Sequence, residues 1–268
     1  MPEVTVFAPG YPSWAELASP DPDRSKRFYR GLFGWNSYTL TVGGLGDYEI
    51  FTLGGVQGPE VAGMQALADD SGTASWTCYF RSDDLPATLA AVRLAGGLVT
   101  VEPLQVADLG VLALCGDLEG ADFGLWDAGR LKGAGVVDEP SAMIWVELAA
   151  RDVEGACRFY GEVFGWTAVE RDHDGSPYTY WKIDGRDVAG LTRIDGSWPA
   201  EEPSHWTPFF WTVDCDVFTD RAAGLGATVR TPPTDHDLGR FCVLVDPTGA
   251  RLGLFTPTVD IAAERLRP

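Results

Sequence analysis

The fold of this chain is decided by a stretch of sequence that occurs twice. Residues 14–35 read WAELASPDPDRSKRFYRGLFGW, and residues 145–166 read WVELAARDVEGACRFYGEVFGW. Eleven of the 22 aligned positions are identical, and every identity has the same offset of 131 residues. Because an internal repeat of this kind marks a repeated structural unit, the two stretches should occupy equivalent positions in two copies of one fold.

Shorter matches extend the repeat along the chain. They are Val61-Ala62-Gly63 with Val188-Ala189-Gly190, Trp76-Thr77 with Trp206-Thr207, Asp108-Leu109-Gly110 with Asp237-Leu238-Gly239, and Gly124-Leu125-Trp126 with Gly253-Leu254-Phe255. A Gly-rich stretch from Asp127 to Pro140 joins the two copies. We therefore predict a first domain over residues 1–130, a linker over 131–141 and a second domain over 142–268.

Each copy is predicted to contain two strand–helix units. Residues 144–148 alternate as in a strand, Asp152 is placed to cap the helix that follows, and Gly165 is placed to end it. Asp21 and Gly34 do the same in the first copy. Further helices are predicted over residues 85–95 and 217–225. Since short strands separated by Gly or Asp-Pro turns follow every helix, the chain is predicted to run β-α-β-β-β four times.

The composition limits what the protein can bind. Lys and Arg number 20 against 39 Asp and Glu, which gives a net charge of −19 and a pI near 4.4. Such a charge repels phosphate backbones and anionic lipids, so we expect no nucleic-acid partner and no membrane partner. No apolar run approaches the roughly 18 residues of a membrane span, and the N-terminus shows no basic segment followed by an apolar one. We expect a cytoplasmic protein, either a monomer or a homodimer.

The cysteines and tryptophans point to different features. The five cysteines are scattered without a CxxC pair, which favours free thiols in a reducing compartment over a zinc or dithiol site. The chain contains ten tryptophans, which is a high number for 268 residues. Some must lie in the core, but so many large rings also indicate a cavity that holds a flat, apolar molecule.

The repeated pattern resembles a known superfamily. A strand, a capped helix ending in RFY…FGW, and a closing strand of the form VDPTGARLGL (residues 245–254) are similar to the vicinal oxygen chelate superfamily, which includes glyoxalase I, bleomycin-resistance proteins and extradiol dioxygenases. The resemblance implies an α+β fold of tandem glyoxalase/bleomycin-resistance-like domains, each βαβββ-βαβββ with a U-shaped cleft. Because the superfamily includes both metal-dependent enzymes and metal-free antibiotic binders, it does not fix the function.

The resemblance also implies where a metal would be held. In the metal enzymes a His or Gln on the first strand and a carboxylate on the last strand are ligands, and here these positions are Trp14 and Trp145, and Gly124 and Gly253. The third ligand would fall near Pro208 in the second half and near Thr77 or Cys78 in the first, with His205 the one imidazole nearby. Since a divalent ion needs three or four converging N, O or S ligands, we expect no metal and no other cofactor.

Strand alternation predicts what the clefts contain instead. Side chains at alternate positions share a face, so Trp145 and Glu147 should point into the second cleft, and Trp14 and Glu16 into the first. Gly124 and Gly253 stand where the metal enzymes carry the carboxylate ligand, and the absence of a side chain there would leave empty volume at the cleft floor. The predicted ligand-binding residues are Trp14, Glu16, Trp126, Trp145, Glu147, Phe210 and Phe255. In the alternative interpretation, Trp14 and Trp145 fill the old metal position and close the clefts.

Three functions are compatible with these residues. The first is metal-independent binding of a planar aromatic small molecule of antibiotic or polyketide type, including a cationic one, in self-resistance or natural-product biosynthesis. The second is a cofactor-independent enzyme, an accessory of oxygenation or cyclisation of aromatic polyketides, in which the buried carboxylate transfers protons. The third, a metal-dependent lyase or dioxygenase, is disfavoured by the residues at the ligand positions.

Overall fold

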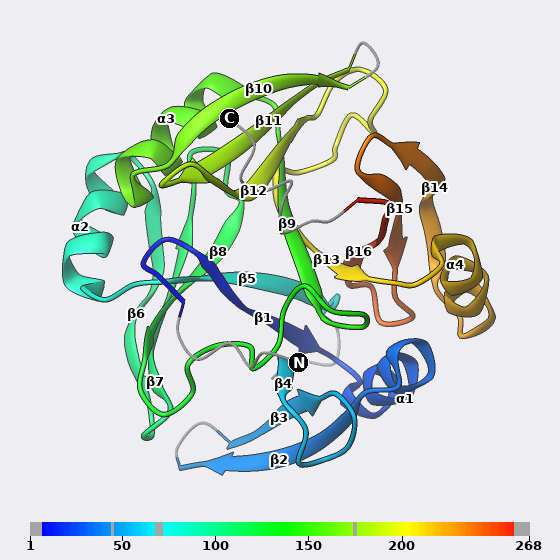
Figure 1. Ribbon diagram of the computed structural model, residues 1–268. Helices are drawn as coiled ribbons and strands as arrows, with labels where there is room; N and C mark the ends of the chain where they lie inside the picture. Colours follow the sequence, from blue (N-terminus) through cyan, green and yellow to red (C-terminus); the bar gives the residue numbers. More distant parts are fainter. Residues whose placement is uncertain (1–6, 44–45, 68–71, 174–175, 260–268) are drawn as a thin grey trace.

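The computed structural model describes residues 7–43, 46–67, 72–173 and 176–259, and each half consists of two βαβββ modules (Figure 1). The first half contains β1 (Pro12–Ser19), α1 (Pro22–Phe33), β2 (Asn36–Val42), β3 (Gly46–Thr52), β4 (Glu60–Ala66), β5 (Ser75–Arg81), α2 (Leu85–Leu94), β6 (Leu98–Val106), β7 (Gly110–Gly116) and β8 (Asp122–Ala128). The second half contains β9 (Met143–Ala150), α3 (Val153–Phe164), β10 (Thr167–His173), β11 (Ser176–Ile183), β12 (Arg186–Arg193), β13 (His205–Trp211), α4 (Cys215–Gly224), β14 (Thr228–His236), β15 (Gly239–Val245) and β16 (Arg251–Pro257).

Each half forms one curled, eight-stranded sheet. The strand order is β2-β3-β4-β1-β5-β8-β7-β6 in the first half and β10-β11-β12-β9-β13-β16-β15-β14 in the second. The first strands of the two modules lie antiparallel at the centre, and each pairs in parallel with the last strand of its own module. The predicted fold class, tandem βαβββ modules, is therefore confirmed.

The helices begin and end where their capping residues predicted. Asp21 and Asp152 accept hydrogen bonds from backbone amides in the first turns of α1 and α3, and Gly34 and Gly165 end these helices in the left-handed conformation, with φ of 74° and 71°. The helix predicted over 217–225 begins two residues earlier, at Cys215, because Asp214 caps it, and the helix predicted over 85–95 ends at Leu94. None of the helices in the described residues is long and apolar enough to cross a bilayer.

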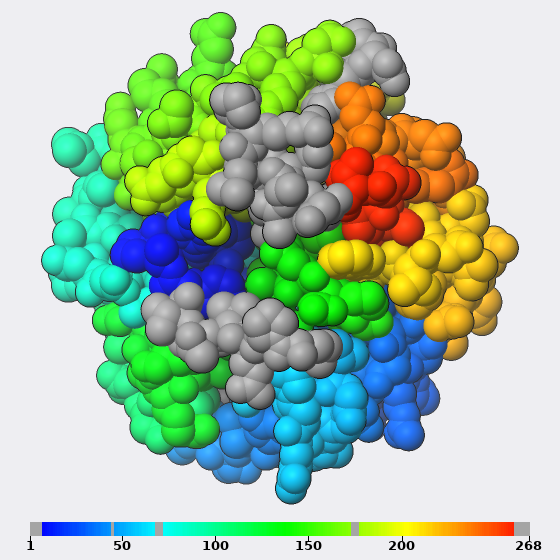
Figure 2. All heavy atoms as spheres, in the orientation of Figure 1, coloured from blue at the N-terminus to red at the C-terminus, as the bar shows by residue number. Residues whose placement is uncertain are grey.

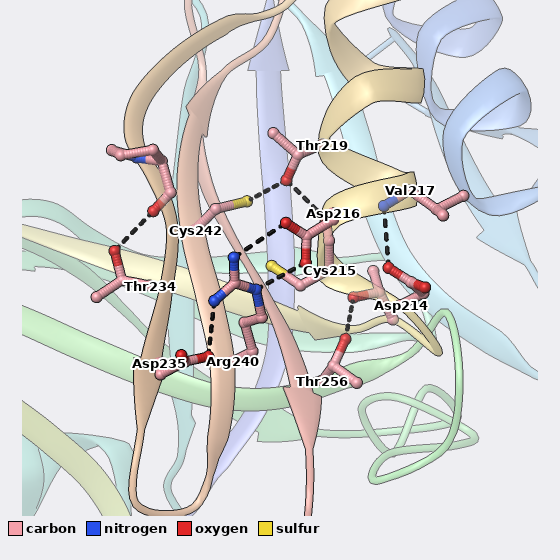
Figure 3. A network of polar contacts seen from close by, with 12 residues as sticks. Asp214, Cys215, Asp216, Val217, Thr219, Thr234, Asp235, Arg240, Cys242 and Thr256 are labelled. Carbon is pink, nitrogen blue, oxygen red and sulfur yellow. Dashed lines mark hydrogen bonds and ion pairs between the residues drawn. The ribbon is translucent and has the colours of Figure 1, made fainter.

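Helix α4 is fixed to the β14–β15 hairpin by polar contacts (Figure 3). Arg240 on β15 reaches Asp216 on α4 at 2.7 and 3.0 Å and Asp235 on β14 at 2.6 Å. Deeper in the structure, the Thr219 hydroxyl on α4 lies 3.0 Å from the Cys242 sulfur on β15. These contacts hold the hairpin that forms one wall of the second sheet's concave face.

The convex faces of the two sheets share one hydrophobic core. Tyr29 on α1 donates a hydrogen bond to Asp246 of the second half at 2.8 Å, and Tyr160 on α3 donates to Asp117 of the first half at 3.1 Å. Helix α1 packs against α4, and α2 packs against α3, so that the halves form one continuous body (Figure 2). The concave face of each sheet therefore looks away from the common core.

Candidate functional site

The concave face of the second sheet carries a cleft of about 740 Å³. Strands β9, β11, β13, β15 and β16 all contribute to its walls. Seven aromatic side chains line it, namely Trp145, Tyr178, Tyr180, Trp198, Phe209, Phe241 and Phe255. The volume lies within the range of roughly 300–1,000 Å³ that is typical of small-molecule sites.

A hydrogen-bonded triad lies within this cleft. The Trp145 indole Nε1 donates to the Tyr178 hydroxyl at 3.1 Å, and that hydroxyl donates to Glu147 Oε2 at 2.7 Å. Gly190 on β12 makes room for the arrangement, because a Cβ there would lie 1.8 Å from the Tyr178 hydroxyl and 2.7 Å from Trp145 Nε1. The chain thus needs glycine at 190 to bring the Trp145–Tyr178–Glu147 triad together.

The surroundings of Glu147 bring the pKa of its carboxyl group close to neutral pH. Burial raises the pKa of Glu147 from 4.5 to about 7, and the hydrogen bond from Tyr178 opposes this rise because it favours the ionised form. Burial and the neighbouring Glu147 raise the pKa of Tyr178 well above its usual value. Tyr178 therefore remains a donor while Glu147 can gain or lose a proton near pH 7.

The first half repeats the triad. Trp14 Nε1 donates to the Tyr48 hydroxyl at 3.1 Å, and Tyr48 donates to Glu16 Oε2 at 2.6 Å. A second phenol, Tyr79, donates to Glu16 Oε1 at 3.2 Å. Phe209 takes the place of Tyr79 in the second half, so Glu147 lacks this second donor.

The first cleft is nevertheless nearly closed, with a volume of about 110 Å³. A second hydrophobic cluster occupies the concave face, and Trp126 within it donates from Nε1 to the Leu131 carbonyl at 2.9 Å. The segment after β8 also crosses the cleft, since Ala134 donates its backbone N–H to Ser13 at 2.8 Å. Residues predicted as a linker thus pack against the first sheet.

The three positions that carry metal ligands in the superfamily lie side by side. Strand register pairs Trp145 with Phe209 and Phe209 with Gly253, and Trp14, Tyr79 and Gly124 form the same row in the first half. Except for the Tyr79 phenol, these rows offer only indole, phenyl and hydrogen, and the described residues contain no cluster of three or more His, Cys, Asp or Glu. The donor set does not fit a divalent ion.

One expectation about the cleft floor needs correction. The third ligand is expected near Pro208 and near Thr77 or Cys78, and the residues that complete the two rows, Phe209 and Tyr79, lie within two residues of these positions. The glycines, however, leave no empty volume, because a Cβ at Gly253 would lie 2.1 Å from the Phe209 ring. A neighbouring ring has filled the space of the missing carboxylate.

The predicted ligand-binding residues are divided between the two concave faces and the core. Trp145, Glu147 and Phe255 line the second cleft, whereas Trp14, Glu16 and Trp126 line the small first one. Phe210 lines neither, because it is fully buried in the common core against rings of the first half. The strand alternation puts Phe209, and not Phe210, on the cleft side, so the expectation for Phe210 is corrected.

Apart from His205, sequence reasoning missed the polar cluster at one end of the second cleft. Arg251 contacts both Glu202 Oε1 and, at 2.8 Å, His205 Nε2, while Arg230 lies 3.6 Å from Glu202 Oε2. All four residues line the cleft. The repeat offers no signal for them, because the first half has other residues at the matching positions.

Comparisons with known proteins agree with this architecture. The family profile described as "Glyoxalase-like domain" matches residues 145–255. The chain is 37% identical to the anthracycline biosynthesis protein DauV of Streptomyces sp. strain C5, covering 92% of this chain and 93% of DauV. It is 36% identical to the anthracycline biosynthesis protein DnrV of Streptomyces peucetius over the same shares.

Solved structures share the fold at low identity. The Mn(II)-bound glyoxalase of Novosphingobium aromaticivorans is 16% identical with a TM-score of 0.63, and covers 92% of this chain and 82% of its own. The 2,3-dioxygenase LapB of Pseudomonas sp. KL28 has the same identity and TM-score and covers 93% of each chain. Together with the βαβββ repeat and the full-length relatives, these similarities show that the chain belongs to the vicinal oxygen chelate superfamily, as a tandem glyoxalase-like member.

Proposed function

We propose that the second cleft binds a planar aromatic small molecule of polyketide type without a metal, in natural-product biosynthesis or self-resistance. The observation that carries the proposal is an aromatic-walled cleft of about 740 Å³ with Glu147 inside it. Aromatic pairs contribute roughly 0.5–1.5 kcal/mol each beyond area burial, so a fused ring system between Trp145 and the opposite wall can reach micromolar affinity.

The relatives support the chemical class of this ligand. DauV and DnrV are named for anthracycline biosynthesis, and they match this chain over nearly its whole length. Anthracyclines are flat aromatic polyketides bearing phenolic hydroxyls and, in their glycosylated forms, an amine. Glu147 offers the matching group, because a carboxylate with a pKa of about 7 can accept a hydrogen bond from a hydroxyl or pair with an ammonium group.

Isothermal titration with 1,8-dihydroxyanthraquinone tests this binding. We expect saturable micromolar binding to the wild type. The variant Phe255→Trp copies Trp126 of the closed half into the open one, and we expect it to weaken binding at least tenfold. Trp126→Phe changes the closed half alone and serves as the matched control with unchanged affinity. No saturable binding, or equal binding by Phe255→Trp, would contradict the proposal.

A second candidate function is proton transfer on the bound molecule. Glu147 favours it, since a general base works best with a pKa near the working pH, and Tyr178 orients the carboxylate. In such a step Glu147 takes a proton from a carbon that is conjugated to a carbonyl, directly or through an aromatic ring, the electron pair is delocalised onto the carbonyl oxygen as an enolate, and the protonated carboxyl returns the proton to carbon or oxygen.

Hydrogen–deuterium exchange distinguishes the enzyme from the binder. The probe is 1,8-dihydroxyanthrone, whose methylene protons exchange with solvent through its enol. If the protein is an enzyme of this kind, mass spectrometry in D₂O should show exchange accelerated by the wild type and by Glu16→Gln, but not by Glu147→Gln. Exchange at the uncatalysed rate with all three proteins, together with binding of the probe, would leave the function as binding alone.

A further inference from the structure

The polar end of the second cleft is built from four separate parts of the chain. Arg230 lies on β14, Arg251 opens β16, His205 opens β13, and Glu202 comes from the segment between β12 and β13. Glu202 is buried and lies between the two guanidinium groups, with Arg251 at one oxygen and Arg230 at the other. Two positive charges thus surround one negative charge.

His205 adds no charge to this cluster. An arginine N–H can only donate, so the 2.8 Å contact with Arg251 makes His205 Nε2 the acceptor. The Nδ1 atom lies 2.7 Å from the Pro203 carbonyl, to which it must donate. Burial and the neighbouring Arg251 lower the pKa of His205, in agreement with this neutral tautomer. The cluster therefore carries a net charge of about +1 in a chain of net charge −19.

The first half provides an internal control for the significance of this charge. Strand register and the repeat place Thr100, Asp122 and Ser75 where the second half has Arg230, Arg251 and His205. None of the three first-half residues is cationic, and the cleft there is nearly closed. The positive charge thus occurs together with the open cleft and not with the fold as such.

Arg230 is placed to serve a ligand. Its guanidinium lies 3.6 Å from Glu202, which is beyond normal hydrogen-bond length, and its side chain is 47% exposed. Arg251 is held more tightly by Glu202 and His205. One arginine is thus fixed as part of the wall, while the other lines the cleft with a more exposed side chain and a longer contact to Glu202.

We propose that the ligand of the second cleft is an aromatic acid, whose carboxylate binds at Arg230 and Arg251 while its ring system lies along Trp145 and Phe209. This assignment rests on the proposed function, because it names the substituent carried by the same ligand. A guanidinium binds a carboxylate through charge-assisted, paired hydrogen bonds, which an uncharged group of the same shape cannot reproduce.

A matched pair of probes tests the assignment. They are 1,8-dihydroxyanthraquinone-3-carboxylate and its 3-carboxamide, which have the same shape and differ in charge. Titration of the wild type at pH 7.5 should show the carboxylate binding about tenfold more tightly. Arg230→Gln should abolish this preference by weakening the carboxylate alone. Arg93→Gln, which removes an exposed arginine of the first half, should leave it intact.

Each other outcome is decisive. Equal binding of both probes to the wild type would overturn the carboxylate assignment while sustaining the aromatic site. Equal weakening of both probes by Arg230→Gln would also overturn it, since it would make Arg230 a clamp for the segment that carries Glu202. Failure of both probes to bind would overturn the proposed function and the assignment with it.

Discussion

The two concave faces contain the same hydrogen-bonded triad, but only one of them encloses a large cleft. Trp14, Tyr48 and Glu16 have the same contacts as Trp145, Tyr178 and Glu147, to within 0.1 Å in both hydrogen bonds. The enclosed volumes are about 110 and 740 Å³. The triad therefore belongs to the repeated fold, and the capacity to hold a ligand depends on what surrounds it.

The surrounding residues differ in size and polarity. Strand β6 of the first half carries Leu104 and Val106. The equivalent strand of the second half, β14, carries Thr234 and His236 at these positions. Trp126 replaces Phe255 and is held over the first cleft by its bond to Leu131. Apolar side chains thus fill the first cleft as a small core, whereas smaller or more polar side chains stand at the matching positions of the open second cleft.

The largest expected contrast comes from truncating the two tryptophans. Trp14 is 4% exposed within the closed cluster, so Trp14→Ala should lower the free energy of unfolding by about 3–5 kcal/mol. Trp145 is only half-buried, so Trp145→Ala should cost less stability but weaken binding of 1,8-dihydroxyanthraquinone more than tenfold. Urea denaturation and calorimetric titration measure the two effects. Equal losses of stability with unchanged ligand affinity would show that both tryptophans fill space in their clefts and do not contact a ligand.

A smaller contrast comes from the glycines beneath the triads. A Cβ at Gly63 would lie 1.9 Å from the Tyr48 hydroxyl, just as a Cβ at Gly190 would lie 1.8 Å from the Tyr178 hydroxyl. Gly63→Ala should destabilise the packed first half by about 1–3 kcal/mol, through overpacking. Gly190→Ala should cost less than this, because Tyr178 can move into the open cleft, but it should weaken ligand binding. Denaturation midpoints that fall equally for both variants would argue against this difference.

The smallest expected effect is on the pH dependence of stability. The pKa of Glu147 is raised to about 7 in the folded protein, so folding favours its protonated form, and this contribution is lost as pH rises from about 4.5 through 7. Glu147→Gln should therefore raise the free energy of unfolding by about 1–2 kcal/mol at pH 8, after allowance for the exposure of the cleft, and change it little at pH 4. Denaturation curves at the two pH values check this.

Glu16 provides the control for that experiment. Burial raises its pKa as well, but hydrogen bonds from both Tyr48 and Tyr79 oppose the rise. Glu16→Gln should therefore give a smaller gain at pH 8 than Glu147→Gln. A larger gain from Glu16→Gln would mean that the second phenol does not stabilise the carboxylate of the closed half.

The repeat, the capped helices and the strand alternation of this protein were determined by the sequence alone. Local patterns suffice for these features, because Asp152, Gly165 and the alternation of residues 144–148 act through neighbouring residues. The same alternation put Trp145 and Glu147 on one face, where both line the cleft.

Only the tertiary structure decided which cleft is open and what lies at its end. Cleft volume depends on side chains from six or more strands and on Leu131 folding back across the first sheet, and no local pattern encodes that sum. Phe210 entered the common core because the opposite half supplied rings to cover it. Glu202 and Arg251 meet across 49 residues of chain. Such convergence follows from strand order and register, which bring distant residues together, and a single sequence does not display it.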